Sequence, residues 1–456
     1  MAHRELSEVY RYVDRNSEQL LQDLCELLAQ PSISTQNVGM EECANKLATM
    51  MRDSGIEAEI LQTEGYPVVY GYVHSGDGLP TLAIYGHYDV QPPDPLELWK
   101  TPPFQPTRIG DHIYARAATD DKGNLVATFK AVQALCSTMG RLPVNLKFFY
   151  EGEEEIGSPN LKSFLLANRD RLSGADAVIL CDRGIHESGR PQLFLGNKGI
   201  IKIEITLHGP KRDVHSSQAP IMPSPVWELV NLLHQVKPDG GKVAIPGFYD
   251  QVVPPTPLER ELIENIPFSV EEYKRDYGLS RLLVDGTPAE LLTELLFQPT
   301  FNIQGIVSGY TGPGTKTILP AKATAKVDIR LVHAMKADDT IARVKDFFAE
   351  RGYGTNLEIL GETEEYKVSP ENPVVQAAMR AARLAYGREP VVWPLLEGSG
   401  PMALFPEILG APTFIIGLGA PFSTANTHAP NENIGIHHYL TGIKMMATLY
   451  ATYEGR

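Results

Sequence analysis

Short apolar runs alternate with helix-like stretches along the first two hundred residues of the chain. Three of these runs span residues 81–85, 144–150 and 177–181. Between the first two, one face of a predicted helix carries Leu125, Ala127, Phe129, Val132 and Leu135. Strands that alternate with helices predict a largely parallel sheet that is covered by helices.

A different pattern begins at about residue 199. Apolar residues alternate with polar ones from Ile201 to Leu207 and again over residues 325–332, as expected of strands with one covered face. Helical stretches at 226–236 and 340–351 and a strand near 357–360 accompany them. We therefore predict a small α+β domain with helices on one side of an antiparallel sheet. The proline-rich segment 246–258 and the helical stretch 259–297 are interpreted as decoration within this insertion.

The first pattern returns at about residue 367. A helix at 374–386, an apolar strand at 413–417 and a final helix at 438–453 complete the chain. The expected fold class is therefore α/β, with a helix-covered mixed sheet and an inserted small α+β domain. The predicted boundaries are 1–198 for the first part of the main domain, 199–366 for the insertion and 367–456 for the second part.

Composition and charge narrow the classes of function. At 456 residues the chain is too long for one compact core, and its formal charge of −15 argues against nucleic acid and anionic membranes as partners. No segment approaches the roughly 20 apolar residues that a membrane-spanning helix needs, and no signal peptide is recognisable. The four cysteines are scattered, which is typical of reduced core thiols. We expect a soluble, cytoplasmic protein.

Polar residues with metal-binding side chains follow several of the predicted strands. Ligands bind at the carboxyl ends of strands in open α/β sheets, so these side chains are expected to meet at one edge. The set comprises His87, Asp120, Glu154, Glu155, Asp182 and His428. Each has an ordinary alternative: an aspartate after a strand is often a helix cap, and EGEEEIGS alone is typical of a solvated acidic loop.

The combination of these residues points to metal chemistry. All six offer nitrogen or oxygen, and none offers a thiolate, which suits zinc, manganese or cobalt. Six such residues exceed what one four-coordinate site needs. A two-metal site with a bridging carboxylate, its ions about 3.5–4 Å apart, accounts for them better.

The motifs around these residues resemble those of the M20 family of co-catalytic metallopeptidases, over almost the whole chain and in order. They are YGHYDVQP (85–92), ATDDKG (118–123), EGEEEIGS (151–158), CDRG (181–184), DVHSS (213–217), DIRLV (328–332), LEGSG (396–400) and NTHAP (426–430). The dipeptidase branch, which includes carnosine-type dipeptidases, is the most similar. One departure is Arg183, which follows a ligand position where carnosine-type relatives carry other residues.

The resemblance implies roles for the residues at the strand ends. Asp120 would bridge two divalent ions, which we expect to be zinc, with manganese or cobalt as alternatives. His87 and Asp182 would complete one site. Glu155 and His428 would complete the other. Glu154 would act as general base, and Asp89 would accept the second ring N–H of His87. The peptide bond between Asp120 and Asp121 would be cis, as is typical of this family.

The resemblance also implies substrate contacts. In the inserted domain, which would serve as a lid and dimerisation domain, His215 would reach a neighbouring subunit's site and steady an oxyanion, so a homodimer is expected. Arg330 would pair with the terminal carboxylate of the substrate. An exposed histidine beside a turn and a surface ion pair are the alternatives for these two residues. Less specific candidates for substrate contact are Thr317, Glu397, Gly398 and Ser399.

The predicted reaction is hydrolysis of the amide bond of a dipeptide or short peptide with a free C-terminal carboxylate. The attacking group would be a metal-bridging hydroxide, with Glu154 as base. An N-acyl-amino-acid deacylase or carboxypeptidase with the same site is the first alternative. A non-catalytic metal-binding protein is the second, and the presence of Glu154 with both ligand histidines argues against it.

Overall fold

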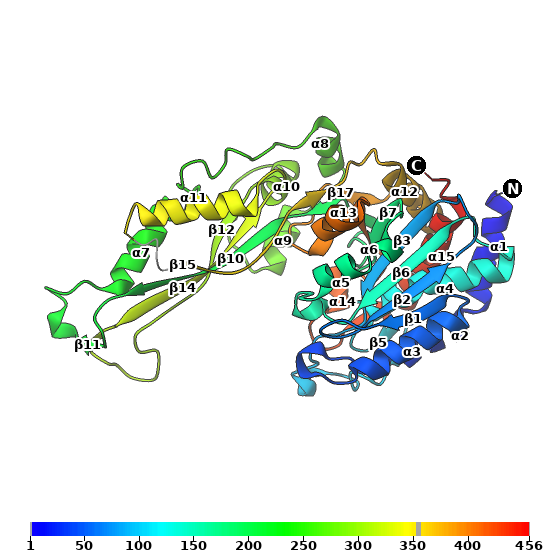
Figure 1. The fold of residues 1–456 in the computed structure, drawn as a ribbon, viewed down its shortest axis with the longest axis horizontal. Helices are drawn as coiled ribbons and strands as arrows, with labels where there is room; N and C mark the ends of the chain where they lie inside the picture. The colour runs from blue at the N-terminus through cyan, green and yellow to red at the C-terminus, as the bar shows by residue number, and fades with distance from the viewer. Residues whose placement is uncertain (1, 353–356, 456) are drawn as a thin grey trace.

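A broad lobe and a narrower extension make up the computed structural model, which describes residues 2–352 and 357–455 (Figure 1). An eight-stranded sheet runs through the broad lobe in the order β1-β2-β6-β3-β7-β18-β8-β17. Its strands are β1 (Glu57–Leu61), β2 (Val68–Val73), β3 (Thr81–His87), β6 (Asn145–Glu151), β7 (Ala177–Leu180), β8 (Gln192–Phe194), β17 (Val391–Trp393) and β18 (Thr413–Gly417).

The centre of this sheet is parallel. β3 pairs in parallel with β6 and β7, and β18 with β7, whereas β1–β2, β2–β6 and β18–β8 are antiparallel. β3 is buried from Leu82 to His87 because it has strands on both sides and helices on both faces. A strand covered in this way needs apolar residues at successive positions, which explains its continuous apolar sequence. The predicted α/β class with a mixed sheet is confirmed.

Helices cover the two faces of the sheet (Figure 1). Leu82 and Ile84 of β3 face one core, and Ala83 and Tyr85 face the other. The first core includes side chains of α1 (Ala2–Arg15), α2 (Ser17–Leu28), α3 (Met40–Asp53), α4 (Lys122–Met139), α12 (Pro373–Tyr386) and α15 (Ile436–Thr452). The second includes side chains of α5 (Leu161–Ala167), α6 (Arg169–Leu172) and α13 (Leu404–Leu409).

The extension is an antiparallel sheet with its own core. The strand order is β12 (Thr300–Ser308), β14 (Lys322–Leu331), β10 (Gly199–His208) and β15 (Leu357–Thr363). Alternate residues of β10, from Ile201 to Leu207, are buried under α7 (Pro225–Val236) and α11 (Ala337–Ala349). The predicted one-sided alternation is therefore confirmed. The exact domain boundaries, 1–198, 199–366 and 367–456, stay a prediction.

The helices between residues 257 and 297 correct one prediction. They are α8 (Pro257–Glu264), α9 (Val270–Asp276) and α10 (Pro288–Phe297). Ile263, Leu292 and Phe297 share a core with Val391 and Leu395 of the broad lobe, so this segment does not simply decorate the extension. It covers apolar side chains at β17, the edge strand of the large sheet, which water would otherwise contact.

Short ladders complete the fold. β9 (Gly196–Asn197) pairs with β16 (Tyr366–Lys367) where the chain enters and leaves the extension. β11 (Val214–His215) pairs with β13 (Ile318–Leu319) at the far end of the extension (Figure 1). A small sheet consists of β19 (Asn433–Gly435), β5 (His112–Tyr114) and β4 (Thr107–Ile109). The short helix α14 (Phe422–Ala425) precedes β19 in the chain. Within the described residues, no helix combines the length and apolarity needed to cross a bilayer.

Candidate metal centre

The predicted ligands meet at one edge of the large sheet. β3 ends at His87, and Asp182 lies two residues beyond the end of β7. Glu155 follows β6 in a short 3-10 turn (Glu154–Ile156). Asp120 precedes α4, and His428 lies between α14 and β19. Because β3, β6 and β7 are parallel, their carboxyl ends bring His87, Glu155 and Asp182 to the same place.

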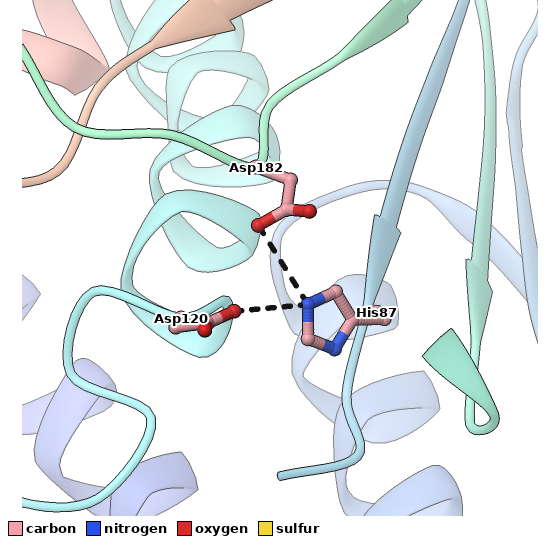
Figure 2. A group of neighbouring side chains, drawn as sticks. All are labelled: His87, Asp120 and Asp182. Carbon is pink, nitrogen blue, oxygen red and sulfur yellow. Dashed lines mark hydrogen bonds and ion pairs between the residues drawn. The ribbon is translucent and has the colours of Figure 1, made fainter. Parts of the chain in front are cut away.

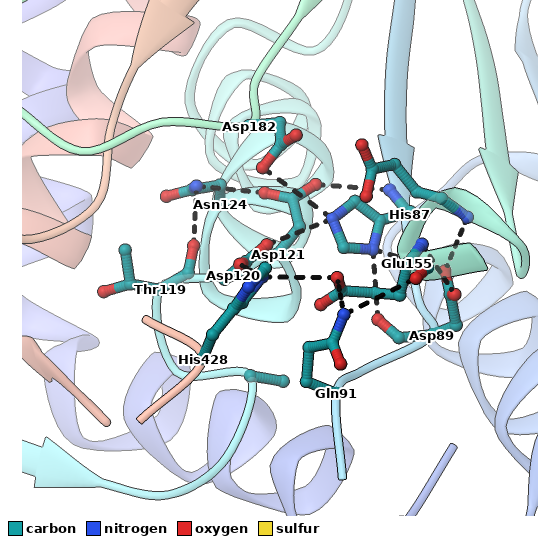
Figure 3. A network of polar contacts seen from close by, with 12 residues as sticks. His87, Asp89, Gln91, Thr119, Asp120, Asp121, Asn124, Glu155, Asp182 and His428 are labelled. Atoms are coloured by element: carbon teal, nitrogen blue, oxygen red, sulfur yellow. Dashed lines mark hydrogen bonds and ion pairs between the residues drawn. The ribbon is translucent and has the colours of Figure 1, made fainter. Parts of the chain in front are cut away.

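Two groups of three residues that could hold a metal ion share Asp120. In the first group, His87 Nε2 lies 3.2 Å from Asp120 Oδ1 and 3.7 Å from Asp182 Oδ1 (Figure 2). In the second, His428 Nε2 lies 2.9 Å from Asp120 Oδ2 and 3.2 Å from Glu155 Oε2 (Figure 3). Within each group the ligand atoms all lie within 4.8 Å of one another. The Asp120 carboxylate thus presents one oxygen to each histidine.

The electrostatics of the cluster favour positive charge. Burial alone would lower the pKa of His87, but the carboxylates of Asp120 and Asp182 hold that pKa well above its ordinary value. Hydrogen bonds to Asp120 and Glu155 raise the pKa of His428 to about 10. Burial acts against the ionised form of Asp120, yet hydrogen bonds from the two histidines lower its pKa.

The donor set fits divalent cations. Among the described residues, only histidine side chains form ion pairs with the carboxylates of Asp120, Glu155 and Asp182. Buried carboxylates without a lysine or arginine partner are costly unless another cation compensates them. Imidazole nitrogen and carboxylate oxygen suit zinc, manganese or cobalt. His87 is fully buried and the Asp182 side chain is 28% exposed, whereas the His428 side chain is 55% exposed, so the cluster is most open to solvent at His428.

Glu154 lies beside this cluster in the same turn as Glu155. Burial and the nearby carboxylates of Asp182 and Asp120 raise the pKa of Glu154 to about 8. Cations at the neighbouring ligands would act in the opposite direction and lower it.

Asp89 supports more of the site than the sequence indicates. His87 Nδ1 lies 3.0 Å from the Asp89 backbone carbonyl oxygen and 3.3 Å from its carboxylate. The same carboxylate accepts the backbone N–H groups of Glu154 and Glu155, both at 3.1 Å. One buried side chain therefore orients a histidine and also holds the turn that carries two glutamates.

Three further residues, Gly86, Gln91 and Asp121, lie inside the quoted motifs, but the sequence did not indicate that they support the site. Asp121 Oδ2 accepts the backbone N–H of His87 at 3.2 Å, and Oδ1 accepts the Asn124 amide at 2.9 Å. A side chain at Gly86 would place its Cβ 2.7 Å from Asp121 Oδ2, so this close approach requires glycine. Gln91 Nε2 donates to Glu155 Oε2 at 2.8 Å. The predicted cis peptide between Asp120 and Asp121 is confirmed.

A second group of predicted residues meets at the junction with the extension. Arg330 Nη1, on β14, donates to Ser399 Oγ at 2.7 Å. The loop that carries Ser399 is tied to the end of β9, because the Lys198 backbone N–H donates to the Gly398 carbonyl oxygen at 3.0 Å. Glu397 in this loop is exposed. The structure therefore brings Arg330 together with Gly398 and Ser399.

The structure does not bring His215 and Thr317 to the metal-ligand cluster of their own chain. Both are exposed, and they are neighbours, since the Ser216 backbone N–H donates to the Thr317 carbonyl oxygen at 3.0 Å. His215 is the last residue of β11 and Thr317 directly precedes β13. This pair of strands lies at the end of the extension that is remote from the large sheet (Figure 1).

Comparisons with known proteins agree with this geometry. The model of "Peptidase family M20/M25/M40" matches residues 83–452. Human Beta-Ala-His dipeptidase is 31% identical over 98% of this chain and 92% of its own length. Among solved structures, the M20 family metallo-carboxypeptidase Sso-CP2 of Sulfolobus solfataricus is 38% identical, with a TM-score of 0.88 over 95% of this chain and 99% of its own. The di-peptidase Dug1p of Saccharomyces cerevisiae is 26% identical, with a TM-score of 0.80 over 100% of this chain and 99% of its own.

Proposed function

Because the chain belongs to peptidase family M20/M25/M40, as its motifs predict, and is a metallopeptidase of the dipeptidase branch, we propose that it cleaves dipeptides with a free C-terminal carboxylate. The observation that carries this proposal is that Asp120 belongs to both groups of three proposed ligands, and that Glu154 lies beside them. Short peptides are included in the proposed substrate class.

The proposed ligand sets are His87, Asp120 and Asp182 for one ion and Asp120, Glu155 and His428 for the other. Two divalent ions, zinc in our proposal and manganese or cobalt as alternatives, would polarise the scissile carbonyl and lower the pKa of water to roughly 7.

The proton transfers fall to Glu154. Its carboxylate takes a proton from the attacking water as the water oxygen bonds to the carbonyl carbon. The same group then gives that proton to the amine nitrogen as the carbon–nitrogen bond breaks, which leaves a carboxylic acid and a free amine. Asp89 holds the backbone of Glu154 and so keeps the base in place.

Arg330 is the proposed partner of the substrate carboxylate. Its guanidinium is already oriented through Ser399, and arginine presents further N–H groups in a fork that matches a carboxylate. Thr317, Glu397 and Gly398 are the weaker candidates for substrate contact. We also propose that His215 acts in a neighbouring copy of the chain, which makes the functional unit a homodimer, and that the protein is cytoplasmic.

A carboxypeptidase is the second candidate function. The observation that favours it is the likeness to Sso-CP2, which is described as a metallo-carboxypeptidase. Arg330 would serve equally well for the terminal carboxylate of a longer peptide. The two functions would therefore differ in how many substrate residues the site can hold on the N-terminal side of the scissile bond.

A substrate panel tests the proposed function. We expect dipeptides to be hydrolysed faster than longer peptides and N-acetyl amino acids of the same sequence. An excess of chelator should abolish the activity, and added zinc, manganese or cobalt should restore it. Preference for the acylated or longer compounds would favour a deacylase or a carboxypeptidase, and full activity in chelator would exclude the two-metal mechanism.

Replacing Arg330 with methionine is expected to raise KM for dipeptides by about 10–100-fold, because hydrogen bonds to a charged group are lost while the apolar stem is kept. The matched control is Lys326→Met, an exposed cation on the same strand, which should leave KM unchanged. Steady-state kinetics with a dipeptide and its C-terminal amide provide the measurement. An equal effect of Arg330→Met on both substrates would contradict the assignment.

A further inference from the structure

A buried ion pair lies beneath the loop that carries Asp120. The side chain of Arg116 is 1% exposed and that of Glu432 is not exposed, and Arg116 Nη1 lies 2.9 Å from Glu432 Oε2. Removing two charges from water is costly, so a buried pair requires further hydrogen bonds around it. Neither residue has a role in the site as described above.

The Glu432 carboxylate accepts four hydrogen bonds from one short segment. Its Oε1 accepts the backbone N–H groups of Thr119 and Asp120, both at 2.9 Å. Its Oε2 accepts the backbone N–H of Ala117 at 2.8 Å and the Arg116 guanidinium. All four donors belong to residues 116–120. The backbone of Asp120 is therefore held directly by Glu432.

Arg116 connects this segment to another part of the site. Its Nη2 donates to the Pro92 carbonyl oxygen at 3.2 Å, in the loop that follows His87 and Asp89. Glu432 itself lies four residues after His428. The Arg116–Glu432 pair thus joins the three chain segments that carry His87, Asp120 and His428.

We propose that Arg116 and Glu432 are positioning residues for the metal centre. They fix the loop from which Asp120 directs one oxygen toward each histidine, and a shared carboxylate serves two ions only in that orientation. This inference rests on the proposed function, since it assumes that Asp120 binds both ions. Replacing groups that orient metal ligands typically costs 10–100-fold in metal affinity or activity.

Glu432→Gln tests the proposal. Glutamine keeps the shape of the side chain but turns an amide N–H₂ toward two of the four donors. We expect calorimetric titration of the metal-free protein with zinc to show binding 10–100-fold weaker than in the wild type. The rate of dipeptide hydrolysis should fall at limiting zinc and recover in part as zinc is raised. A purely structural role would not produce this dependence on zinc.

Glu259→Gln is the matched control. Glu259 is also buried and ion-paired, with Lys367 Nζ at 2.6 Å, and it also accepts a backbone N–H, that of Thr256 at 2.7 Å. It lies on α8, outside the proposed site, so zinc affinity and rate should equal those of the wild type. If Glu432→Gln fails to fold, Arg116→Lys provides the same test, because an ammonium group cannot reproduce the two-pronged contact with Glu432 and Pro92.

The outcomes separate this inference from the proposed function. Unchanged zinc affinity in the folded variant, with or without lower thermal stability of the metal-free protein, would overturn the positioning role. A wild-type protein that fails to bind two zinc ions, or to hydrolyse peptides, would instead overturn the proposed function.

Discussion

Replacing Glu154 with glutamine is expected to lower kcat by roughly 10²–10⁴-fold, the usual contribution of a general base, while both ions stay bound. Glutamine has nearly the same shape, and the backbone N–H of residue 154 can still donate to Asp89. It cannot accept a proton from water or return one to the leaving amine. Steady-state kinetics and metal analysis of the purified variant provide the two measurements.

The neighbouring glutamate supplies the contrast. Glu155→Gln changes the same type of residue in the same turn, but this carboxylate lies against His428 and is a proposed ligand. That variant should lose metal together with activity, whereas Glu154→Gln should lose activity alone. Undiminished turnover in Glu154→Gln, or loss of its metal, would show that Glu154 is not the base.

His215→Ala is expected to lower kcat by about 10²–10³-fold, as removal of one oxyanion donor does in other hydrolases. His215 Nδ1 accepts the Ser217 backbone N–H at 3.2 Å, so the neutral ring carries its proton on Nε2, which can donate. His208, an exposed histidine at the end of β10, is the matched control, and His208→Ala should behave as the wild type.

Mixing two inactive variants tests whether His215 acts in another copy of the chain. In a dimer formed from one Glu154→Gln chain and one His215→Ala chain, one of the two sites has both an intact base and an intact histidine. Random pairing in a two-fold dimer should therefore restore about a quarter of the wild-type rate. A mixture that stays inactive, or a protein that is monomeric in solution, would contradict action between copies.

Exposed apolar side chains on the extension support such a dimer. Ile221, between β11 and α7, is 83% exposed, and Trp227, in the first turn of α7, is 69% exposed. Contact with a second copy of the chain would remove these two apolar side chains from water.

Much of the fold could be predicted from local patterns. The continuous apolar run of β3 and the alternation in β10 differ because one strand has two covered faces and the other has one. The packing of α8 and α10 on β17 could not be predicted in this way, because helix periodicity shows that a face is buried but not which surface buries it.

The sequence by itself determined the chemical types of the side chains at the candidate metal centre. Histidines and carboxylates directly after apolar strands, such as His87 and Asp182, are a local signal, and parallel strands bring such residues to one edge. Only the tertiary structure decided how these ligands are held. Arg116 and Glu432 are 316 residues apart in the chain, and nothing near either one indicates a partner. Their contact exists because β19 pairs with β5, which brings Glu432 beneath the loop of Asp120.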